Sequence, residues 1–181
     1  ILRSTYPHAR VASVDTSAAE ALDGVVAVVT GEDAQRWTNP ARSAPDGWGS
    51  FCLATGKVNF VGEPIAAVAA VSRYVAEDAL ELIEVEYEPL PPVVDPFAAM
   101  EESSPLVIDE HGTNVMMHRT FTWGDVDAAL GEAAHVFTER FRWNRVGANP
   151  METYGAVSEW DPHTLEVNIQ GSVQSPGVPA L

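Results

Sequence analysis

The run Ile65-Ala-Ala-Val-Ala-Ala-Val71 is the longest apolar stretch of the chain, and it determines how the residues around it are interpreted. Its length suits a buried strand, whereas a membrane-spanning helix needs ~18 or more apolar residues. After Ser72, the apolar side chains between Val75 and Ile83 recur at the spacing of one helical face. The sequence therefore predicts a buried strand followed by an amphipathic helix.

Strands and helices alternate on both sides of this run. The residues of Val25–Thr30 are apolar on both parities, which predicts a strand covered on both faces. Thr16 or Ser17 can cap a short helix over 18–22, and Gly31 begins another helix. The other elements expected here are strands at 10–15, 58–61 and 85–88 and a Pro- and Gly-rich loop at 38–56. They predict a mixed unit of helices and strands through about residue 100.

The pattern weakens from residue 95, where prolines and glycines interrupt it. A turn entering a short helix is expected at 122–130. Alternating apolar and charged residues predict a long strand at 135–145. Two further strands are expected at 153–160 and 165–170, joined by a turn at Asp161-Pro-His163.

Composition disfavours two classes of partner. The 181 residues include 26 acidic and 10 basic side chains, for a net charge of −16. This charge repels a nucleic-acid backbone and an anionic lipid surface. No secretory signal is visible, although the chain begins at Ile1 rather than Met. The single cysteine, Cys52, cannot form an internal disulfide, which favours a reducing, cytoplasmic compartment.

Three segments carry longer motifs, in this order along the chain. The first runs from Arg3-Ser-Thr-Tyr-Pro-His-Ala-Arg10 to Gly31-Glu-Asp33, and the second from Val58-Asn-Phe-Val-Gly-Glu-Pro64 to Val85-Glu-Tyr-Glu-Pro-Leu-Pro91. The third combines Asn149-Pro-Met-Glu-Thr-Tyr-Gly155 with Gly171-Ser-Val-Gln-Ser-Pro176. Together they resemble the large subunits of molybdenum hydroxylases, the family of xanthine dehydrogenase, aldehyde oxidase and aerobic CO dehydrogenase. The third is most similar to the CO dehydrogenase-like branch.

The resemblance implies an α+β fold. Residues 1–100 would form an α/β hammerhead domain, 101–114 a linker, and 115–181 the N-terminal, incomplete part of the molybdopterin-binding domain. It also implies a molybdopterin cofactor, in its molybdopterin cytosine dinucleotide form. The implied partners are a flavin subunit that holds FAD, an iron–sulfur subunit that holds [2Fe–2S], and the remaining part of the large subunit or a completing chain.

The implied reaction is the oxidation of an electron-poor carbon with oxygen taken from water, with electrons passing to the iron–sulfur and flavin centres. Gln174 is the residue to which the resemblance assigns a cofactor contact. In the family, the glutamine of the Gln-x-Pro motif hydrogen-bonds an oxo ligand of molybdenum. A neutral amide suits this role because it donates a hydrogen bond without adding charge. Without the resemblance, a solvent-exposed loop glutamine is the simpler interpretation.

Other candidate residues favour structural roles. Glu152 is interpreted as a structural residue rather than a general base, because the family's essential glutamate lies far beyond residue 181. It is expected to accept hydrogen bonds from the backbone or from an arginine near the cofactor. The five histidines lack metal-ligand spacing, and His8 is expected to be structural. Gly62-Glu63-Pro64 is interpreted as a turn in which Gly62 adopts positive φ and Pro64 ends the strand. We therefore expect no catalytic residue and no metal ligand in the chain.

The family's glycine-rich cofactor segment also lies beyond Leu181. We therefore expect the 181-residue chain alone to be inactive, and to self-associate or need companion chains. The competing hypothesis is a non-catalytic interaction module that packs against partner subunits. The Gln174 segment favours the enzyme, and the sequence does not indicate the substrate.

Overall fold

The computed structural model describes residues 1–41, 44–45, 47–144, 146–147 and 149–172. The chain divides into two compact units, Ile1–His118 and the residues from Arg119 onward. Within the described ranges, no helix is long and apolar enough to cross a membrane.

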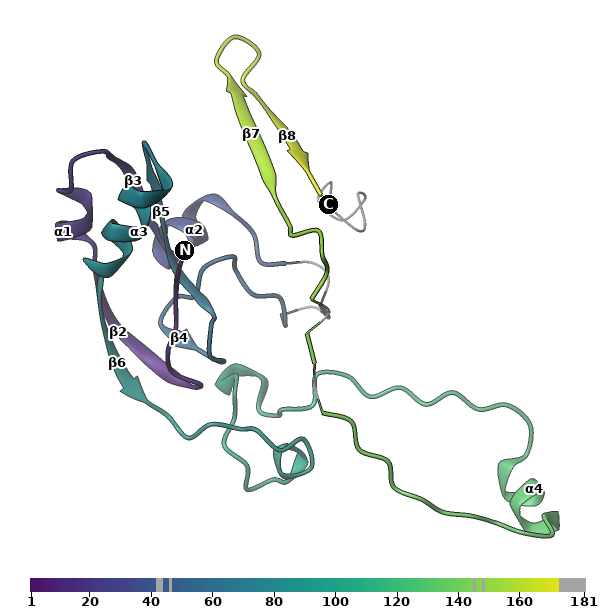
Figure 1. The fold of residues 1–181 in the computed structure, drawn as a ribbon. Helices are drawn as coiled ribbons and strands as arrows, with labels where there is room; N and C mark the ends of the chain where they lie inside the picture. Colours follow the sequence, from purple (N-terminus) through teal and green to yellow (C-terminus); the bar gives the residue numbers. More distant parts are fainter. Residues whose placement is uncertain (42–43, 46, 145, 148, 173–181) are drawn as a thin grey trace. The chain divides into compact units, whose positions relative to one another are not determined.

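Two three-stranded sheets form the framework of the first unit (Figure 1). In one, β5 (Pro64–Ala70) lies between β1 (Leu2–Arg3) and β3 (Val25–Thr30). In the other, β2 (Ala9–Asp15) lies between β4 (Lys57–Val58) and β6 (Glu84–Pro89). All these pairs are antiparallel. Antiparallel sheets with separate helices confirm the α+β fold class.

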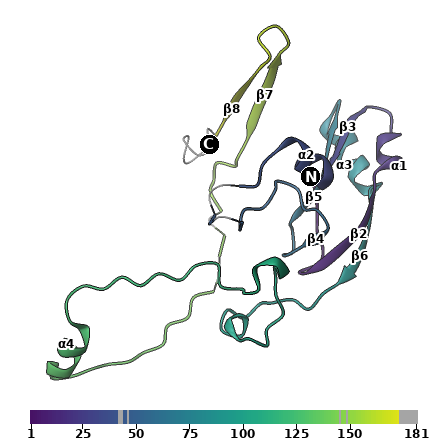
Figure 2. The same cartoon turned by 180° about the vertical axis from the view of Figure 1, so that it is seen from behind.

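Helices α1 (Ser17–Glu20) and α3 (Arg73–Glu81) lie side by side at one end of the sheets (Figure 1 and Figure 2). The core cluster beneath them contains Ala19, Ala66, Ala79 and Ile83. Alanine side chains let α3 approach β5 closely and let α1 pack against α3 and β3. A second cluster, Ala9, Val58 and Ile65, lies between the two sheets. The strand and helix predicted from residues 65–83 are therefore confirmed.

Each helix in the first unit begins at a polar side chain. Ser72 Oγ accepts a hydrogen bond from Val75 N at the start of α3 (3.3 Å). At α2 (Gly31–Trp37), Asp33 accepts hydrogen bonds from Thr30 N (3.0 Å) and Thr30 Oγ1 (2.9 Å). At α1 the predicted hydroxyl cap is wrong, because the Asp15 carboxylate accepts the hydrogen bond from Ser17 N (2.9 Å).

Two predictions about strands in this unit are also wrong. β3 is not covered on both faces, since Val26 is 71% exposed. β4 ends at Val58 instead of continuing to residue 61, and β5 begins at Pro64, which the sequence analysis placed in a strand-breaking turn. The first position of a strand tolerates proline even in a central strand such as β5, because no ladder hydrogen bond is needed from its nitrogen.

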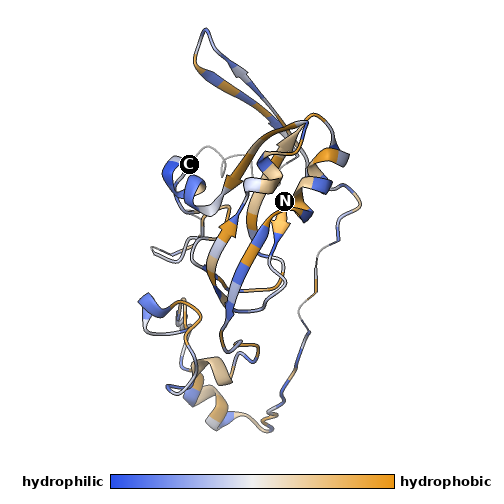
Figure 3. Ribbon diagram, turned by 90° about the vertical axis from the view of Figure 1, so that its left-hand side faces the viewer, coloured by the Kyte–Doolittle hydropathy of each residue, from blue (hydrophilic) through white to orange (hydrophobic). Residues whose placement is uncertain are grey.

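The second unit contains helix α4 (Val126–Glu132) and a hairpin of β7 (Ala156–Asp161) and β8 (Glu166–Gly171). The hairpin confirms two of the predicted strands, and the residues of β8 alternate between polar and apolar (Figure 3). The strand predicted at 135–145 is wrong, since none of its described residues belongs to a strand. Ring pairs two residues apart, such as Phe141 and Trp143 (centroids 6.1 Å), fit an extended backbone. The alternating pattern therefore predicted the local conformation correctly. It could not show whether a neighbouring strand would pair with this segment, and pairing is what makes a strand.

Candidate functional site

The β7–β8 hairpin is held in register by its turn. The Asp161 carboxylate accepts hydrogen bonds from His163 N (2.8 Å) and Thr164 N (3.4 Å), and these donors lower the pKa of Asp161. Leu165 adopts a left-handed φ of 58° and donates its N–H to Asp161 O (2.9 Å). This turn aligns Trp160 with Val167. The predicted turn at 161–163 is confirmed.

Two hydrogen bonds close the other end of the hairpin. Ser172 N donates to Gly155 O (3.0 Å), and Ser172 Oγ donates to Glu152 Oε1 (3.0 Å). Glu152 and Gly155 belong to the motif at 149–155, whereas Ser172 belongs to the motif that starts at Gly171. The fold thus brings together the two parts of the third motif, and we call this junction, Met151–Gly155 with Gly171–Ser172, the hairpin base.

The hairpin base presents free hydrogen-bonding groups. Met151 is 103% exposed and Tyr154 is 75% exposed. Within the described residues, no hydrogen bond involves the backbone N–H of Met151, Thr153 or Tyr154. Unpartnered backbone donors suit a ligand rich in oxygen acceptors, such as phosphate, carbonyl or oxo groups. The chemistry of this segment therefore fits a polar cofactor.

Gln174 lies outside the described residues, two positions after Ser172. Glu152 accepts a hydrogen bond, as expected, but from the Ser172 hydroxyl rather than from an arginine or the backbone. Sequence reasoning did not identify Ser172 as a partner. A serine beside a glycine is common in loops, and only the hairpin register places it next to Glu152.

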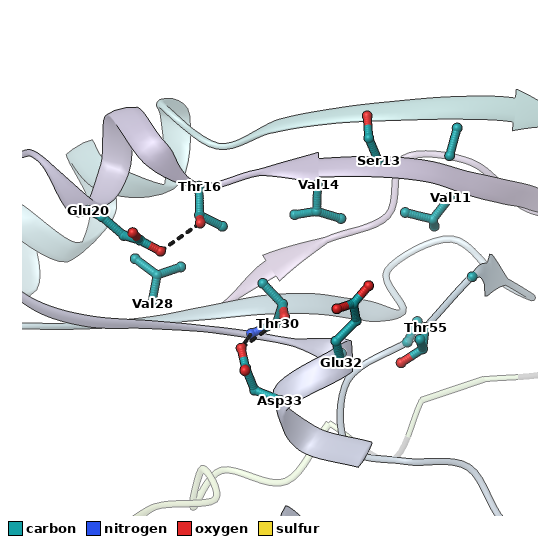
Figure 4. A pocket seen from close by; sticks show the side chains of 14 residues that line it. Val11, Ser13, Val14, Thr16, Glu20, Val28, Thr30, Glu32, Asp33 and Thr55 are labelled. Carbon is teal, nitrogen blue, oxygen red and sulfur yellow. Dashed lines mark hydrogen bonds between the residues drawn. The ribbon is translucent and has the colours of Figure 1, made fainter. Parts of the chain in front are cut away.

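A cavity of about 420 Å³ in the first unit is lined mainly by β2, β3 and α2 (Figure 4). Two of its acidic side chains already have local partners. Glu20 accepts a hydrogen bond from Thr16 Oγ1 (2.7 Å), and Asp33 is bound to Thr30 at the start of α2. The Thr30 backbone and hydroxyl donors lower the pKa of Asp33. The third acidic side chain, Glu32, pairs with Arg36 of the same helix (3.7 Å). The acidity of this cavity therefore serves local helix contacts and does not define a site.

Among the described residues of the first unit, Glu63 is the one buried carboxyl group. Burial raises its pKa, while hydrogen bonds from the backbone of Asn59 and Phe60 oppose that shift. Its backbone oxygen also accepts from Ser4 N (2.9 Å). Gly62 has φ of 89°, so the predicted positive-φ turn is confirmed. These contacts make Glu63 a structural residue of the 59–63 turn.

The histidines form no cluster in the described part of the chain, where no group of three His, Cys, Asp or Glu side chains could hold a metal ion. His8 is 4% exposed, and its Nδ1 lies 2.8 Å from Pro91 O. A buried ring hydrogen-bonded to a carbonyl supports the structural role expected for His8.

Comparison with known proteins identifies relatives along the whole chain. Residues 1–91 match the a/b hammerhead domain of aldehyde oxidase and xanthine dehydrogenase, and residues 107–178 match the molybdopterin cofactor-binding domain. The carbon monoxide dehydrogenase large chain of Afipia carboxidovorans is 39% identical over 98% of this chain and 24% of its own. The 6-hydroxypseudooxynicotine dehydrogenase complex subunit gamma of Paenarthrobacter nicotinovorans is 35% identical over 96% of this chain and 23% of its own.

Comparison with solved structures finds the same kind of enzyme as comparison of sequences. Quinoline 2-oxidoreductase from Pseudomonas putida 86 superimposes with a TM-score of 0.85 and 36% identity, over 97% of this chain and 23% of that one. CO dehydrogenase from Oligotropha carboxidovorans has a TM-score of 0.84 and 39% identity, over 98% of this chain and 24% of that one. The chain therefore spans about a quarter of the length of the relatives it matches.

Proposed function

Because the chain belongs to the aldehyde oxidase and xanthine dehydrogenase family, we propose that it contributes the hammerhead domain and the first part of the molybdopterin-binding domain to a molybdenum hydroxylase. We assign these domains to residues 1–100 and 115–181, with a linker at 101–114. The observation that carries the proposal is the hairpin base, where Glu152 and Gly155 bind Ser172 and unite the two parts of the cofactor motif.

The residues of the hairpin base, together with Gln174, would hold the molybdopterin cofactor. The N–H groups of Met151, Thr153 and Tyr154 have no partner among the described residues and are available as donors to its polar groups. Glu152, through its hydrogen bond from Ser172, ties these donors to the end of β8, two residues before Gln174 in the sequence. The Gln174 amide would donate a hydrogen bond to an oxo ligand of the cofactor and would orient it without adding charge. When bound, the cofactor supplies the oxidation of an electron-poor carbon with oxygen from water.

The assembled enzyme passes the electrons to partner subunits. In this proposal one partner holds FAD, another holds [2Fe–2S], and the remaining part of the large subunit or a completing chain supplies the other cofactor contacts. The cofactor is the cytosine dinucleotide form of molybdopterin, and the enzyme resembles the CO dehydrogenase-like branch. Cys52 has no cysteine partner in the chain, which supports a reducing, cytoplasmic compartment.

Substitution of Gln174 in the complete enzyme tests this role. Gln174→Ala should leave folding unchanged and reduce turnover roughly 10- to 1000-fold, the scale of losing one preorganised donor. Gln174→Glu should be worse, because an ionised carboxylate cannot donate and its charge opposes the oxo ligand. The matched control is Gln170→Ala, which removes an exposed amide from β8 in the same hairpin. Steady-state turnover and molybdenum content are measured on each variant.

Each outcome of this experiment has a distinct meaning. Full activity of Gln174→Ala at equal molybdenum content would remove the proposed role. Activity lost in proportion to molybdenum would shift that role from orienting the oxo group to retaining the cofactor. Complete assembled enzyme that contains no molybdenum would contradict the proposed function itself.

One observation favours a non-catalytic interaction module as the second candidate. The second unit exposes large aromatic side chains, including Phe137 (87%) and Trp143 (83%). Aromatic residues are enriched at protein interfaces. The two functions are separated by the same metal measurement, because an interaction module would assemble with its partners without molybdenum.

A further inference from the structure

We infer that residues 95–114, where the sequence pattern weakens, form a clamp docked on the rest of the first unit, and that this clamp fixes the start of the molybdopterin-binding segment. The clamp contains two 3₁₀ turns, η1 (Ala98–Met100) and η2 (Asp109–His111). Two side-chain contacts, called anchors below, attach the clamp to the rest of the first unit. The hydrogen bonds of one asparagine, called the brace, connect the clamp internally. The assignment of the segment that it fixes rests on the proposed function, whereas the clamp itself rests on the contacts.

The first anchor is an ion pair. Lys57 Nζ on β4 lies 2.9 Å from Asp109 Oδ2 on η2, across 52 residues of sequence. Lys57 is the only lysine of the chain, and its side chain is 17% exposed. Lys57, with smaller contributions from Arg10 and His8, lowers the pKa of Asp109. The clamp carboxylate therefore has a direct cationic partner in Lys57 on β4, and Arg10 and His8 add a weaker electrostatic effect.

The second anchor is a ring stack. His111, at the end of η2, stacks on Trp48 with ring centroids 4.0 Å apart and an interplanar angle of 15°. Trp48 comes from the loop between α2 and β4, so the two anchors attach η2 to different parts of the first unit. Both anchors lie within three residues of each other on the clamp. This arrangement restrains the orientation of η2 as well as its distance from β4.

Asn114 is the internal brace. Its Oδ1 accepts a hydrogen bond from Val107 N (2.9 Å), and its Nδ2 donates to Ala99 O (3.1 Å) and Pro105 O (2.9 Å). An amide side chain is needed here because it offers an acceptor and two donor hydrogens on one planar group. At the start of the clamp, the Asp95 carboxylate accepts from Phe97 N (2.8 Å) and Ala98 N (3.0 Å). Hydrogen bonds therefore connect the parts of the clamp to one another, from η1 to Asn114.

The clamp overlaps the start of the second family match. That match begins at residue 107, whereas the first unit continues to His118. Residues 107–114 thus belong to the molybdopterin-binding match by sequence and to the first unit by contacts. Asp109 and Asn114 are positioning residues in this arrangement, since they act on where the following segment leaves the first unit.

Hydrogen exchange of the full 181-residue chain, measured by mass spectrometry, tests the clamp. Asn114→Ala should increase exchange across residues 97–107 roughly tenfold, because several bonds that brace the segment are lost. Asp109→Ala should increase exchange in η2 roughly two- to fivefold, the scale of losing an ion pair. The matched control Glu110→Gln removes a neighbouring exposed charge and should leave exchange unchanged.

A rescue separates positioning from a general loss of folding. Asp109→Glu should restore most of the protection that Asp109→Ala loses, since it keeps the charge. Higher salt should weaken protection of η2 in the wild type and leave Asp109→Ala unaffected. Fast exchange of residues 97–114 in the wild type, or equal exchange in Asp109→Ala and Glu110→Gln, would overturn the clamp. These readouts need no cofactor, so the clamp can fail while the proposed function stands, and the reverse.

Discussion

At the scale of single residues, Glu63 links the 59–63 turn to pH. Burial raises its pKa above the ordinary value of 4.5, so the folded chain holds this proton more tightly than the unfolded chain. Stability from this group is therefore greatest below pH 4.5 and falls as pH rises through the pKa of the folded state. Glu63→Gln removes this dependence. The difference in Tm, variant minus wild type, should become more positive between about pH 4 and about pH 7. A constant or decreasing difference would contradict the assignment.

Gly31 is required where α2 meets the loop before β4. A Cβ on this residue would lie 2.1 Å from Ala54 O and 2.5 Å from Thr55 Oγ1. We expect Gly31→Ala to lower the free energy of unfolding by about 1–3 kcal/mol, because the Ala54 backbone must move. Gly131→Ala in α4 is the control, since a Cβ there meets nothing within 4 Å. Chemical denaturation should show a loss for Gly31→Ala alone, and similar stability of both variants would sink the argument.

The sequence predicted correctly the role of residues whose own backbone conformation determines that role. Gly62 in a positive-φ turn was predictable, because few other residues adopt that conformation at low cost. The Glu152–Ser172 contact was not, since it depends on the register of a hairpin between the two residues. The cofactor contact of Gln174 came from resemblance alone and stays a prediction.

At the scale of elements, α3 offers a test of helix capping. Ser72 Oγ accepts from Val75 N (3.3 Å) and satisfies one of the free donors at the start of the helix. Ser72→Ala should cost about 0.5–2 kcal/mol of stability. Ser72→Asp keeps an acceptor and should cost little, so it serves as the matched control. Thermal denaturation of the three proteins checks the order, and equal loss in both variants would exclude a capping role.

The sequence predicted best those elements whose conformation and bounds depend on neighbouring residues in the chain. Residues 85–88 alternate between apolar and acidic side chains, and the apolar run that starts at residue 65 follows Gly62-Glu-Pro64. Both segments are strands whose bounds are close to the expected ones. The strand expected at 135–145 alternates equally well but is not paired. A hydrophobic period fixes which side chains share a face, whereas a strand also needs a neighbour, and no local pattern encodes that neighbour.

At the scale of the whole molecule, exposed apolar surface predicts association. Trp160 (54% exposed), Val167 (54%) and Ile169 (68%) share one face of the β7–β8 hairpin, and an isolated two-stranded hairpin is marginally stable in water. We expect the chain to self-associate with increasing concentration in analytical ultracentrifugation. Trp160→Ser with Ile169→Thr should weaken this association, whereas Val157→Thr, on the opposite face, should not. A compact monomer at all concentrations would be the contrary result.

The closed hairpin base has a practical consequence. Because Gly155 O and Ser172 N meet at one point, the chain enters and leaves the hairpin at the same place. The tip at Pro162-His163 can therefore be lengthened without moving Glu152 or Ser172, since exposed loop tips tolerate insertion. The hairpin can therefore be replaced as a unit. A fluorescent reporter inserted at its tip would follow assembly of the subunits in real time.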